Sequence, residues 1–291
     1  MKKKYALSDI KQLSPFKLLS PVVIWMLLFF IVPLLLVVIV SFMQRGQYGD
    51  IKYVLTIGNY KNMINLLYLN VFIKSLGIAI VTTLVCLIFG YPFAYFIAKA
   101  PRKFSGILLL LVMIPFWTNS LVRTYAWIIL LRTEGIINTY LMALHIIKTP
   151  LQLLYNNTAV FIGMFYMMFP FMVLPIYTSV EKLDKSYLEA ASDLGANNVI
   201  TFAKITLPLT MSGVISGCML VFVPTLGYFF IPDLMGGSKV LLLSNLIKNQ
   251  FLAARNWPFG SAISVILIVV MLLIIGMYFK LTKKHQEGQV L

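Results

Sequence analysis

Long runs of hydrophobic residues alternate with short polar segments along the whole chain. Six of these runs are long enough to cross the hydrocarbon core of a bilayer, which takes about 20 helical residues at about 1.5 Å each. They cover residues 22–43, 73–98, 106–131, 158–178, 209–232 and 262–281. Each run is predicted to be a helix, because lipid offers no partner for a free backbone N–H or C=O and the sequence lacks the short alternating segments of a barrel. The expected fold class is therefore all-α, a polytopic membrane protein with six transmembrane helices.

The composition indicates that a bilayer is the natural solvent of this chain. Of its 291 residues, 60% are hydrophobic and only 11% are charged, and the mean hydropathy is +0.91. So few polar residues cannot coat a soluble globule. The formal charge of +15 would suggest nucleic acid binding in a soluble domain. Here the basic residues lie in short runs between hydrophobic stretches, so they indicate membrane topology, and we expect no nucleic acid partner.

The distribution of Lys and Arg predicts the orientation in the membrane. If the N-terminus lies inside, the inner connections carry fourteen of these residues and the outer connections eight, with Lys74 and Arg123 inside predicted spans. Short basic loops stay in the cytoplasm, so both termini are expected there. The first span is too long for a signal peptide and no A-x-A-like site follows it. We therefore divide the chain into a cytoplasmic segment 1–21, a transmembrane domain 22–281 and a cytoplasmic tail 282–291.

The longest predicted cytoplasmic connection, residues 179–208, contains the signals of two short helices. Ser186 followed three residues later by Glu189 is a capping box, which marks the start of the first helix. Gly195 suits the left-handed position after the end of that helix. Either asparagine of the Ala-Asn-Asn run after Gly195 can cap the second helix. We expect a helix–turn–helix below the membrane.

A seven-residue motif runs through this connection. Its pattern is Glu-Ala-Ala, three residues, Gly, nine residues, and Ile-x-Leu-Pro, and it is filled by Glu189, Ala190, Ala191, Gly195, Ile205, Leu207 and Pro208. The loop resembles the signature loop of permease subunits of binding-protein-dependent ABC importers. The resemblance implies the type I permease fold of these importers, in which the first short helix, the coupling helix, docks in a groove of a cytoplasmic ATPase. It assigns Glu189, Ala190, Ala191 and Gly195 to that contact.

Local structure offers a simpler role for the same residues. Glu189 could merely complete the capping box, Gly195 could merely end a helix, and Pro208 suits the first turn of the fifth span, where a missing N–H matters little. Both kinds of role can hold at once. The small residues Ala190 and Ala191 would let another backbone approach closely, which a plain connector does not need. Docking is therefore the favoured hypothesis.

Five further segments extend the resemblance over nearly the whole chain. They are Gly90–Lys99, Ile114–Tyr125, Pro170–Tyr177, Asp233–Gly237 and Asn256–Gly260. They resemble the B-type permeases of the spermidine/putrescine branch of this family, although permeases for other small solutes share parts of them. The resemblance implies a bacterial cytoplasmic membrane, a second permease of the C type, two copies of an A-type cytoplasmic ATPase and an extracytoplasmic polyamine-binding protein.

Polar residues inside the third predicted span mark a possible translocation path. An unpaired charge at the bilayer centre is unfavourable by at least about 2.5–3.5 kcal/mol, so such residues must face protein or water. Asn119 and Arg123 are four residues apart and would share one helical face, flanked by Trp117 and Tyr125. They could line the path. Equally, they could join helices, with Arg123 paired to a carboxylate or to carbonyl groups.

For a polyamine, the path needs carboxylates and aromatic faces, because these hold ammonium groups. Asp233 is the first candidate, since it follows Tyr228 and Phe229 at the predicted outer end of the fifth span. Glu134, in the loop after the third span, is the second. Alternatively, Asp233 could cap a loop helix or pair with Lys239.

Several kinds of function find no support in the sequence. No Gly-x-x-x-x-Gly-Lys-Ser/Thr loop is present, so ATP and Mg²⁺ are expected on a partner subunit. Cys86 and Cys218 lie in hydrophobic runs, and only His145 and His285 could supply imidazole ligands, so we expect no metal, no cofactor and no enzyme activity in this chain.

A secondary transporter is the rival from another class, but its usual acidic proton relays are nearly missing from the spans. The hypothesis is alternating access driven by the partner ATPases.

Overall fold

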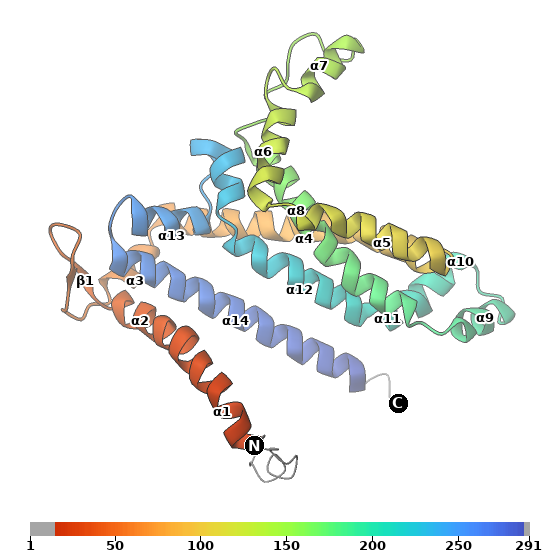
Figure 1. Ribbon diagram of the computed structural model, residues 1–291, viewed down its shortest axis with the longest axis horizontal. Helices are drawn as coiled ribbons and strands as arrows, with labels where there is room; N and C mark the ends of the chain where they lie inside the picture. Colours follow the sequence, from red (N-terminus) through yellow and green to blue (C-terminus); the bar gives the residue numbers. More distant parts are fainter. Residues whose placement is uncertain (1–14, 288–291) are drawn as a thin grey trace, which may run out of the picture. The chain divides into compact units, whose positions relative to one another are not determined.

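The computed structural model describes residues 15–287, and nearly all regular structure in them is helical (Figure 1). Residues 1–14 of the predicted N-terminal segment and residues 288–291 of the predicted tail lie outside the described part. The chain divides into two compact units. One combines Met1–Ile64 with Asn249–Ile268, and the other combines Asn65–Lys248 with Val269–Leu291.

The first unit begins with one long helical path of three segments. These are α1 (Pro15–Met26), the π-helical turn η2 (Leu27–Ile31) and α2 (Val32–Ser41). Pro33 lies at the start of α2 and lacks a backbone N–H, and the wider π turn before it absorbs the missing hydrogen bond. A two-stranded antiparallel hairpin follows, β1 (Gln44–Arg45) and β2 (Ile51–Lys52), and then α3 (Gly58–Met63). The Asn59 amide of α3 donates to the carbonyls of Ser41 and Met43, at 2.9 and 2.8 Å, and so fixes the end of α2.

The core of the second unit is made by three helices that pack against one another. They are α4 (Leu66–Lys99), α8 (Asn157–Glu181) and α12 (Met211–Gly227). Met164, Met168 and Met172 of α8 are almost fully buried in it. Gly90 of α4 and Gly217 of α12 both face Met172, because a Cβ at either glycine would lie within 3 Å of its side chain. Small residues allow this close approach of helix backbones, as is usual in membranes.

The third predicted span is two helices rather than one. They are α5 (Arg102–Trp117) and α6 (Ser120–Leu131), and the path bends by 92° between Arg102–Trp117 and Ser120–Ala143. Thr118 and Asn119 bond locally instead of continuing the helix: the Thr118 hydroxyl donates to the Pro115 carbonyl at 2.7 Å, and the Asn119 side chain accepts from the Leu121 N–H at 2.8 Å. The prediction of one helix over 106–131 was therefore wrong. The helix α7 (Ile136–Ala143) follows.

The fifth predicted span is also shorter than expected. The helical path bends by 65° at Thr210, between the segments Asn198–Leu209 and Met211–Gly227, and α12 ends at Gly227 instead of residue 232. The incoming segments are α10 (Asn198–Thr201), the π turn η3 (Phe202–Thr206) and α11 (Leu207–Leu209). The outgoing segments are η4 (Pro232–Gly236), η5 (Gly237–Lys239) and α13 (Leu243–Leu252).

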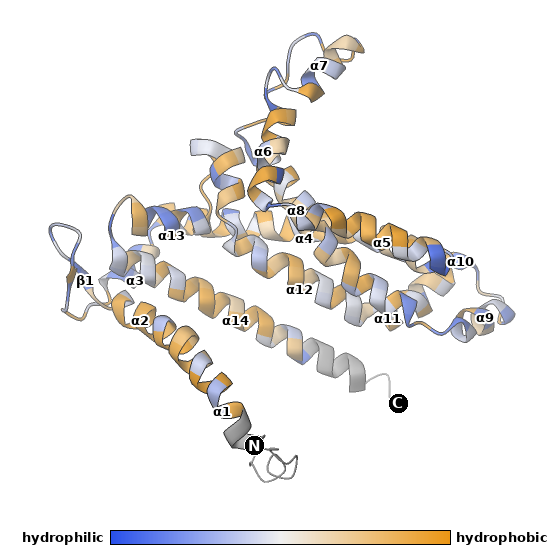
Figure 2. Ribbon diagram, viewed as in Figure 1, coloured by the Kyte–Doolittle hydropathy of each residue, from blue (hydrophilic) through white to orange (hydrophobic). Residues whose placement is uncertain are grey.

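The number of spans agrees with the prediction. Four helices are long and apolar enough to cross a membrane, and the two bent pairs bring the total to as many as six among the described residues. The last of the four is the apolar part of α14 (Trp257–Glu287). Figure 2 shows hydrophobic residues along these helices and more polar ones on α13. None of the most apolar window of Leu19–Ser41 is buried, against 56% for Asn157–Glu181.

The contact between α12 and α8 should depend on a glycine. A Cβ at Gly213 would lie 2.6 Å from the Pro175 carbonyl oxygen and 2.3 Å from the Ser179 hydroxyl oxygen. The Pro175 carbonyl is part of a helix backbone and cannot move aside as a flexible side chain can. We therefore expect Gly213→Ala to lower the free energy of unfolding by about 1–3 kcal/mol. Gly77→Ala is the matched control, because a Cβ there meets nothing within 4 Å. Thermal unfolding of the detergent-solubilised protein measures both. Equal melting temperatures of the two variants would contradict this packing.

Candidate docking helix and polar positions of the spans

The docking candidate is α9 (Lys185–Asp193), and its start differs from the prediction. Asp184 is the N-cap, and its carboxylate accepts from the Ser186 N–H at 3.0 Å. This hydrogen bond lowers the pKa of the Asp184 carboxyl. The capping box predicted from Ser186 and Glu189 was wrong, because an aspartate two residues earlier is a strong cap and the helix begins before Ser186. Glu189 is therefore not needed to start the helix.

The end of α9 confirms the role predicted for Gly195. Its φ is +79°, and its N–H donates to the Ser192 carbonyl at 2.9 Å, while the Ala196 N–H donates to the Ala191 carbonyl at 3.0 Å. These two bonds form the Schellman motif, which satisfies carbonyls at a helix end. Asn197 then caps α10 by accepting from the Ile200 N–H at 2.8 Å.

The motif residues divide into exposed and buried groups. Glu189, Ala190 and Gly195 are exposed, whereas Ala191 is only 4% exposed. A Cβ at Gly195 would meet nothing within 4 Å, so the glycine is required by its backbone angle and not by crowding within this chain. The face formed by Glu189 and Ala190 is thus available to a partner.

The rest of the motif leads from the docking helix into the membrane. Ile205 lies in η3, and Leu207 and Pro208 lie in α11, all half-buried. The Thr210 hydroxyl donates to the Thr206 carbonyl at 2.7 Å and lies 2.8 Å from the Tyr91 hydroxyl of α4. The segment that follows α9 is therefore fixed to the helical core.

Two cavities flank α9. The larger, of about 800 Å³, is lined by Lys99, Arg102, Glu181, Lys185 and Glu189 among others. The smaller, of about 360 Å³, is lined by Tyr95, Ser192, Asn198, Phe202 and Thr206 among others. Because space separates α9 from the ends of the neighbouring helices, α9 is held by its ends and by Ala191 and does not pack solidly along its length.

The residues predicted for the path in the third span lie on both sides of the bend. Asn119 is the N-cap of α6, and its carbonyl accepts from the Arg123 N–H at 3.2 Å, so these two residues are one helical turn apart at the start of α6. Trp117 is 78% exposed, and Asn119 and Tyr125 are exposed as well. The bend between α5 and α6 separates Trp117, at the end of α5, from Asn119, Arg123 and Tyr125.

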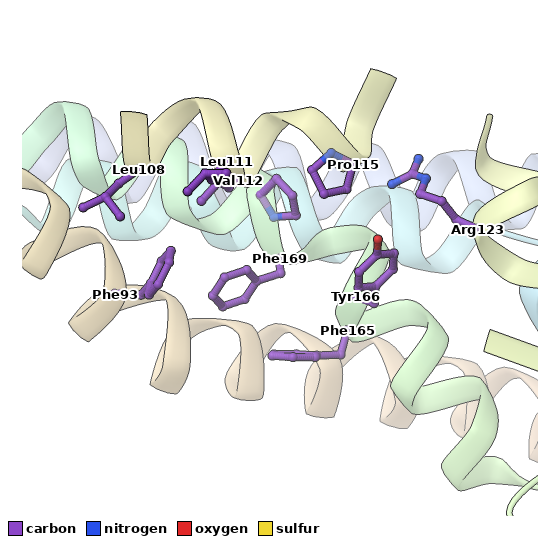
Figure 3. A pocket seen from close by; sticks show the side chains of 10 residues that line it. Phe93, Leu108, Leu111, Val112, Pro115, Arg123, Phe165, Tyr166 and Phe169 are labelled. Atoms are coloured by element: carbon purple, nitrogen blue, oxygen red, sulfur yellow. The ribbon is translucent and has the colours of Figure 1, made fainter. Parts of the chain in front are cut away.

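Arg123 lies at an apolar cavity of about 280 Å³ (Figure 3). Figure 3 shows it beside Pro115 and Tyr166, with Phe93 and Leu108 at the opposite end. Its guanidinium carbon is 5.1 Å from the centroid of the Phe116 ring, a cation–π contact. The Nε atom is buried and has no hydrogen-bond partner among the described residues. The alternative in which Arg123 pairs with a carboxylate is not seen among the described residues.

Asp233 pairs with Lys248 and not with Lys239, the partner considered in the alternative to substrate contact. Its carboxylate accepts from the Lys248 ammonium and, at 3.2 Å, from the Asn245 amide, while Lys239 takes no part. The Lys248 ammonium lies 6.0 Å from the centroid of the Phe229 ring. Sequence reasoning missed Asn245 and Lys248, because they lie in a segment that was treated as loop and no fixed spacing links them to Asp233.

Of the remaining candidates, Glu134 lies in another loop, whereas Tyr228 directly precedes Phe229 of this cluster. Glu134 is exposed in the turn between α6 and α7, and Tyr228 stacks near Phe230 at 4.7 Å between ring centroids. Within residues 15–287, no three His, Cys, Asp or Glu side chains come together as a metal site. Cys86 and Cys218 are both free thiols.

Known proteins resemble this chain in sequence and in fold. Residues 90–285 match the family model described as "Binding-protein-dependent transport system inner membrane component". The chain is 47% identical over 259 residues to the spermidine/putrescine transport system permease protein PotB of Escherichia coli (strain K12), covering 89% of this chain and 94% of that protein. It is also 47% identical to PotB of Haemophilus influenzae, covering 89% and 91%.

Solved structures of low sequence identity share the fold. A chain of a bacterial alginate ABC transporter, solved with an alginate-bound periplasmic protein, superposes with a TM-score of 0.69 at 15% identity, covering 92% of this chain and 93% of that one. The family model spans about two thirds of the sequence. The chain therefore belongs to the family of binding-protein-dependent transport system inner membrane components, the permease subunits of ABC importers.

Proposed function

We propose that this chain forms, together with a second permease, the membrane pathway through which an ATP-driven importer takes up spermidine and putrescine. The observation that carries this proposal is the 47% identity to polyamine permeases over 89% of the chain. The alternative is a related importer for another small solute. An ion-coupled secondary transporter is disfavoured, because the family depends on a binding protein.

The proposed assembly has four further subunits. These are a PotC-like permease, two copies of a PotA-like cytoplasmic ATPase and a PotD-like extracytoplasmic polyamine-binding protein. ATP and Mg²⁺ would bind the ATPase, and this chain would bind no cofactor of its own. No nucleic acid partner is expected. The long apolar helix Leu19–Ser41 supports contact with lipid or with another membrane subunit.

The proposed energy transfer runs through α9. Its exposed residues Glu189 and Ala190 would lie in a groove of the ATPase, and the Gly195 turn would set the angle at which the helix is presented. Closure of the two ATPases on nucleotide would draw the coupling helices together and rock the spans between inward-facing and outward-facing states. The cavities on either side of α9 leave room for such a movement.

The proposed orientation has both termini in the cytoplasm of a bacterium. The excess of basic residues on the inner connections, fourteen against eight, supports this choice. In this orientation the loop 179–208 faces the ATPases, and Asp233 and Phe229 lie toward the outer end of the fifth span. Asp233 is the proposed contact for a substrate ammonium. Trp117, Asn119 and Tyr125 stay predicted path residues, whereas the charge of Arg123 would repel a cationic substrate.

Uptake by the reconstituted importer tests the substrate. We expect vesicles that contain the complete complex and its binding protein to accumulate labelled spermidine and putrescine only when ATP is supplied. Excess unlabelled polyamine should abolish the signal, and excess amino acids or oxyanions should leave it unchanged. Accumulation of one of those other solutes, with none of the polyamines, would instead establish the alternative.

Two carboxylates on α9 allow a matched test of docking. Glu189 and Asp193 are both exposed, about one turn apart, and only Glu189 belongs to the motif. Since Asp184 caps the helix, Glu189→Ala should leave α9 folded, reduce uptake at least severalfold and weaken co-purification of the ATPase. Asp193→Ala should behave much like the native protein. Normal assembly and normal transport by Glu189→Ala would contradict the docking role.

A further inference from the structure

The break after α12 exposes two backbone carbonyls that α13 satisfies. The Ser244 hydroxyl donates to the Tyr228 carbonyl at 2.8 Å, and the Asn245 amide donates to the Phe229 carbonyl at 2.9 Å. Carbonyls at the C-terminal end of a helix carry partial negative charge. In membrane transporters, helix interruptions of this kind often surround a substrate or ion. The Tyr228 carbonyl at the end of α12 therefore adds negative potential to this break, whereas the Phe229 carbonyl also accepts from the Asp233 N–H at 3.1 Å.

The orientation of the Asn245 side chain is fixed by its partners. Its Nδ2 atom donates to the Phe229 carbonyl and to the Asp233 carboxylate, both of which are acceptors only, so the amide cannot be flipped. Its Oδ1 atom is consequently left as a buried acceptor without a partner in the described part of the chain, on a residue that is 3% exposed. A buried acceptor of this kind calls for an explanation, such as a missing donor.

The Lys248 ammonium already shows how a cation is held here. It donates to the Asp233 carboxylate and lies 6.0 Å from the Phe229 ring centroid. A carboxylate combined with an aromatic face is the chemistry by which proteins bind alkylammonium groups. The Lys248 and Asp233 side chains keep 29% and 38% of their surface exposed, so a ligand can reach the pair. Exposed ion pairs stabilise a fold only slightly. Stability alone therefore does not explain why Asp233, Lys248 and Phe229 lie together.

We propose that Asp233, Asn245 and Phe229 form an alkylammonium site in which Lys248 acts as an intramolecular place-holder that the substrate must displace. The identification of the substrate as a polyamine rests on the proposed function. A tethered ammonium competes at a high effective concentration. A monoamine that displaces Lys248 exchanges one ion pair for another and gains little. A polyamine brings a second ammonium that can make further contacts, so it recovers affinity that a monoamine cannot.

Amine binding by the assembled importer, without its binding protein, tests this site. Calorimetry in lipid nanodiscs should show that Lys248→Met binds spermidine about tenfold more tightly than the native complex, because the competitor is gone. The affinity for butylamine, a monoamine, should rise by about the same factor, because both ligands displace the same tethered ammonium. Lys248→Arg, which keeps the charge, should resemble the native complex. Asp233→Asn should lose binding in both the native and the Lys248→Met background.

Two controls separate competition from a structural effect. Lys239→Met removes a nearby lysine that pairs with no carboxylate among the described residues and should change nothing. Lys248→Cys should bind like Lys248→Met, and modification with an ethylammonium thiosulfonate should restore native binding, whereas the neutral methyl reagent should not. If Lys248→Met fails to assemble, the comparison of unmodified and modified Lys248→Cys tests the competition in its place.

Some outcomes would overturn the proposal. Spermidine affinity unchanged or weakened in assembled Lys248→Met, affinity retained in Asp233→Asn, or no amine binding by any variant would each do so. Failure of the proposed function looks different, because the native importer would then take up no polyamine in the uptake assay. The butylamine measurements would still report on the site, since they require only an alkylammonium ligand.

Discussion

Lipid offers no hydrogen-bond partner to a backbone, so every interruption of a membrane helix must be satisfied from within the protein. This chain interrupts its apolar helices at defined places and provides a local partner at each. Thr118 and Asn119 close the two helix ends at the bend between α5 and α6. Where α12 ends, the Ser244 and Asn245 side chains donate hydrogen bonds to the Tyr228 and Phe229 carbonyls. The bends that shape the membrane domain therefore depend on a few hydroxyl and amide side chains.

The same constraint separates a rigid part of the molecule from a lightly attached one. Helices α4, α8 and α12 pack through glycines and buried methionines, and close packing of this kind transmits movement and does not absorb it. Helix α9, by contrast, has a cap at each end, one buried alanine and cavities on two sides. A helix held in this way can follow an external partner, and the Thr206–Thr210 segment connects it to the core.

Much of the fold could be predicted from hydrophobicity, and less of the site. The number of spans followed from the length of the apolar runs compared with the thickness of a bilayer. The left-handed turn at Gly195 followed from backbone sterics. Both are local properties of the sequence. The breaks at Asn119 and Gly227 did not follow from such properties, because they depend on side chains bonding to backbone only once the chain is folded. The cap by Asp184 was missed because Asp184 and Ser186 are both good caps and lie two residues apart. The pairing of Asp233 with Lys248 instead of Lys239 required the position of α13.

The central claim is that α9 lies in the cytoplasm against the ATPase. A single cysteine in place of the exposed Ala190, in a protein without other reactive cysteines, tests it in sealed vesicles of known orientation. A membrane-impermeant maleimide should label this cysteine only from the cytoplasmic side, and binding of the ATPase should protect it. Labelling from the external side, or labelling that the ATPase leaves unchanged, would contradict the account.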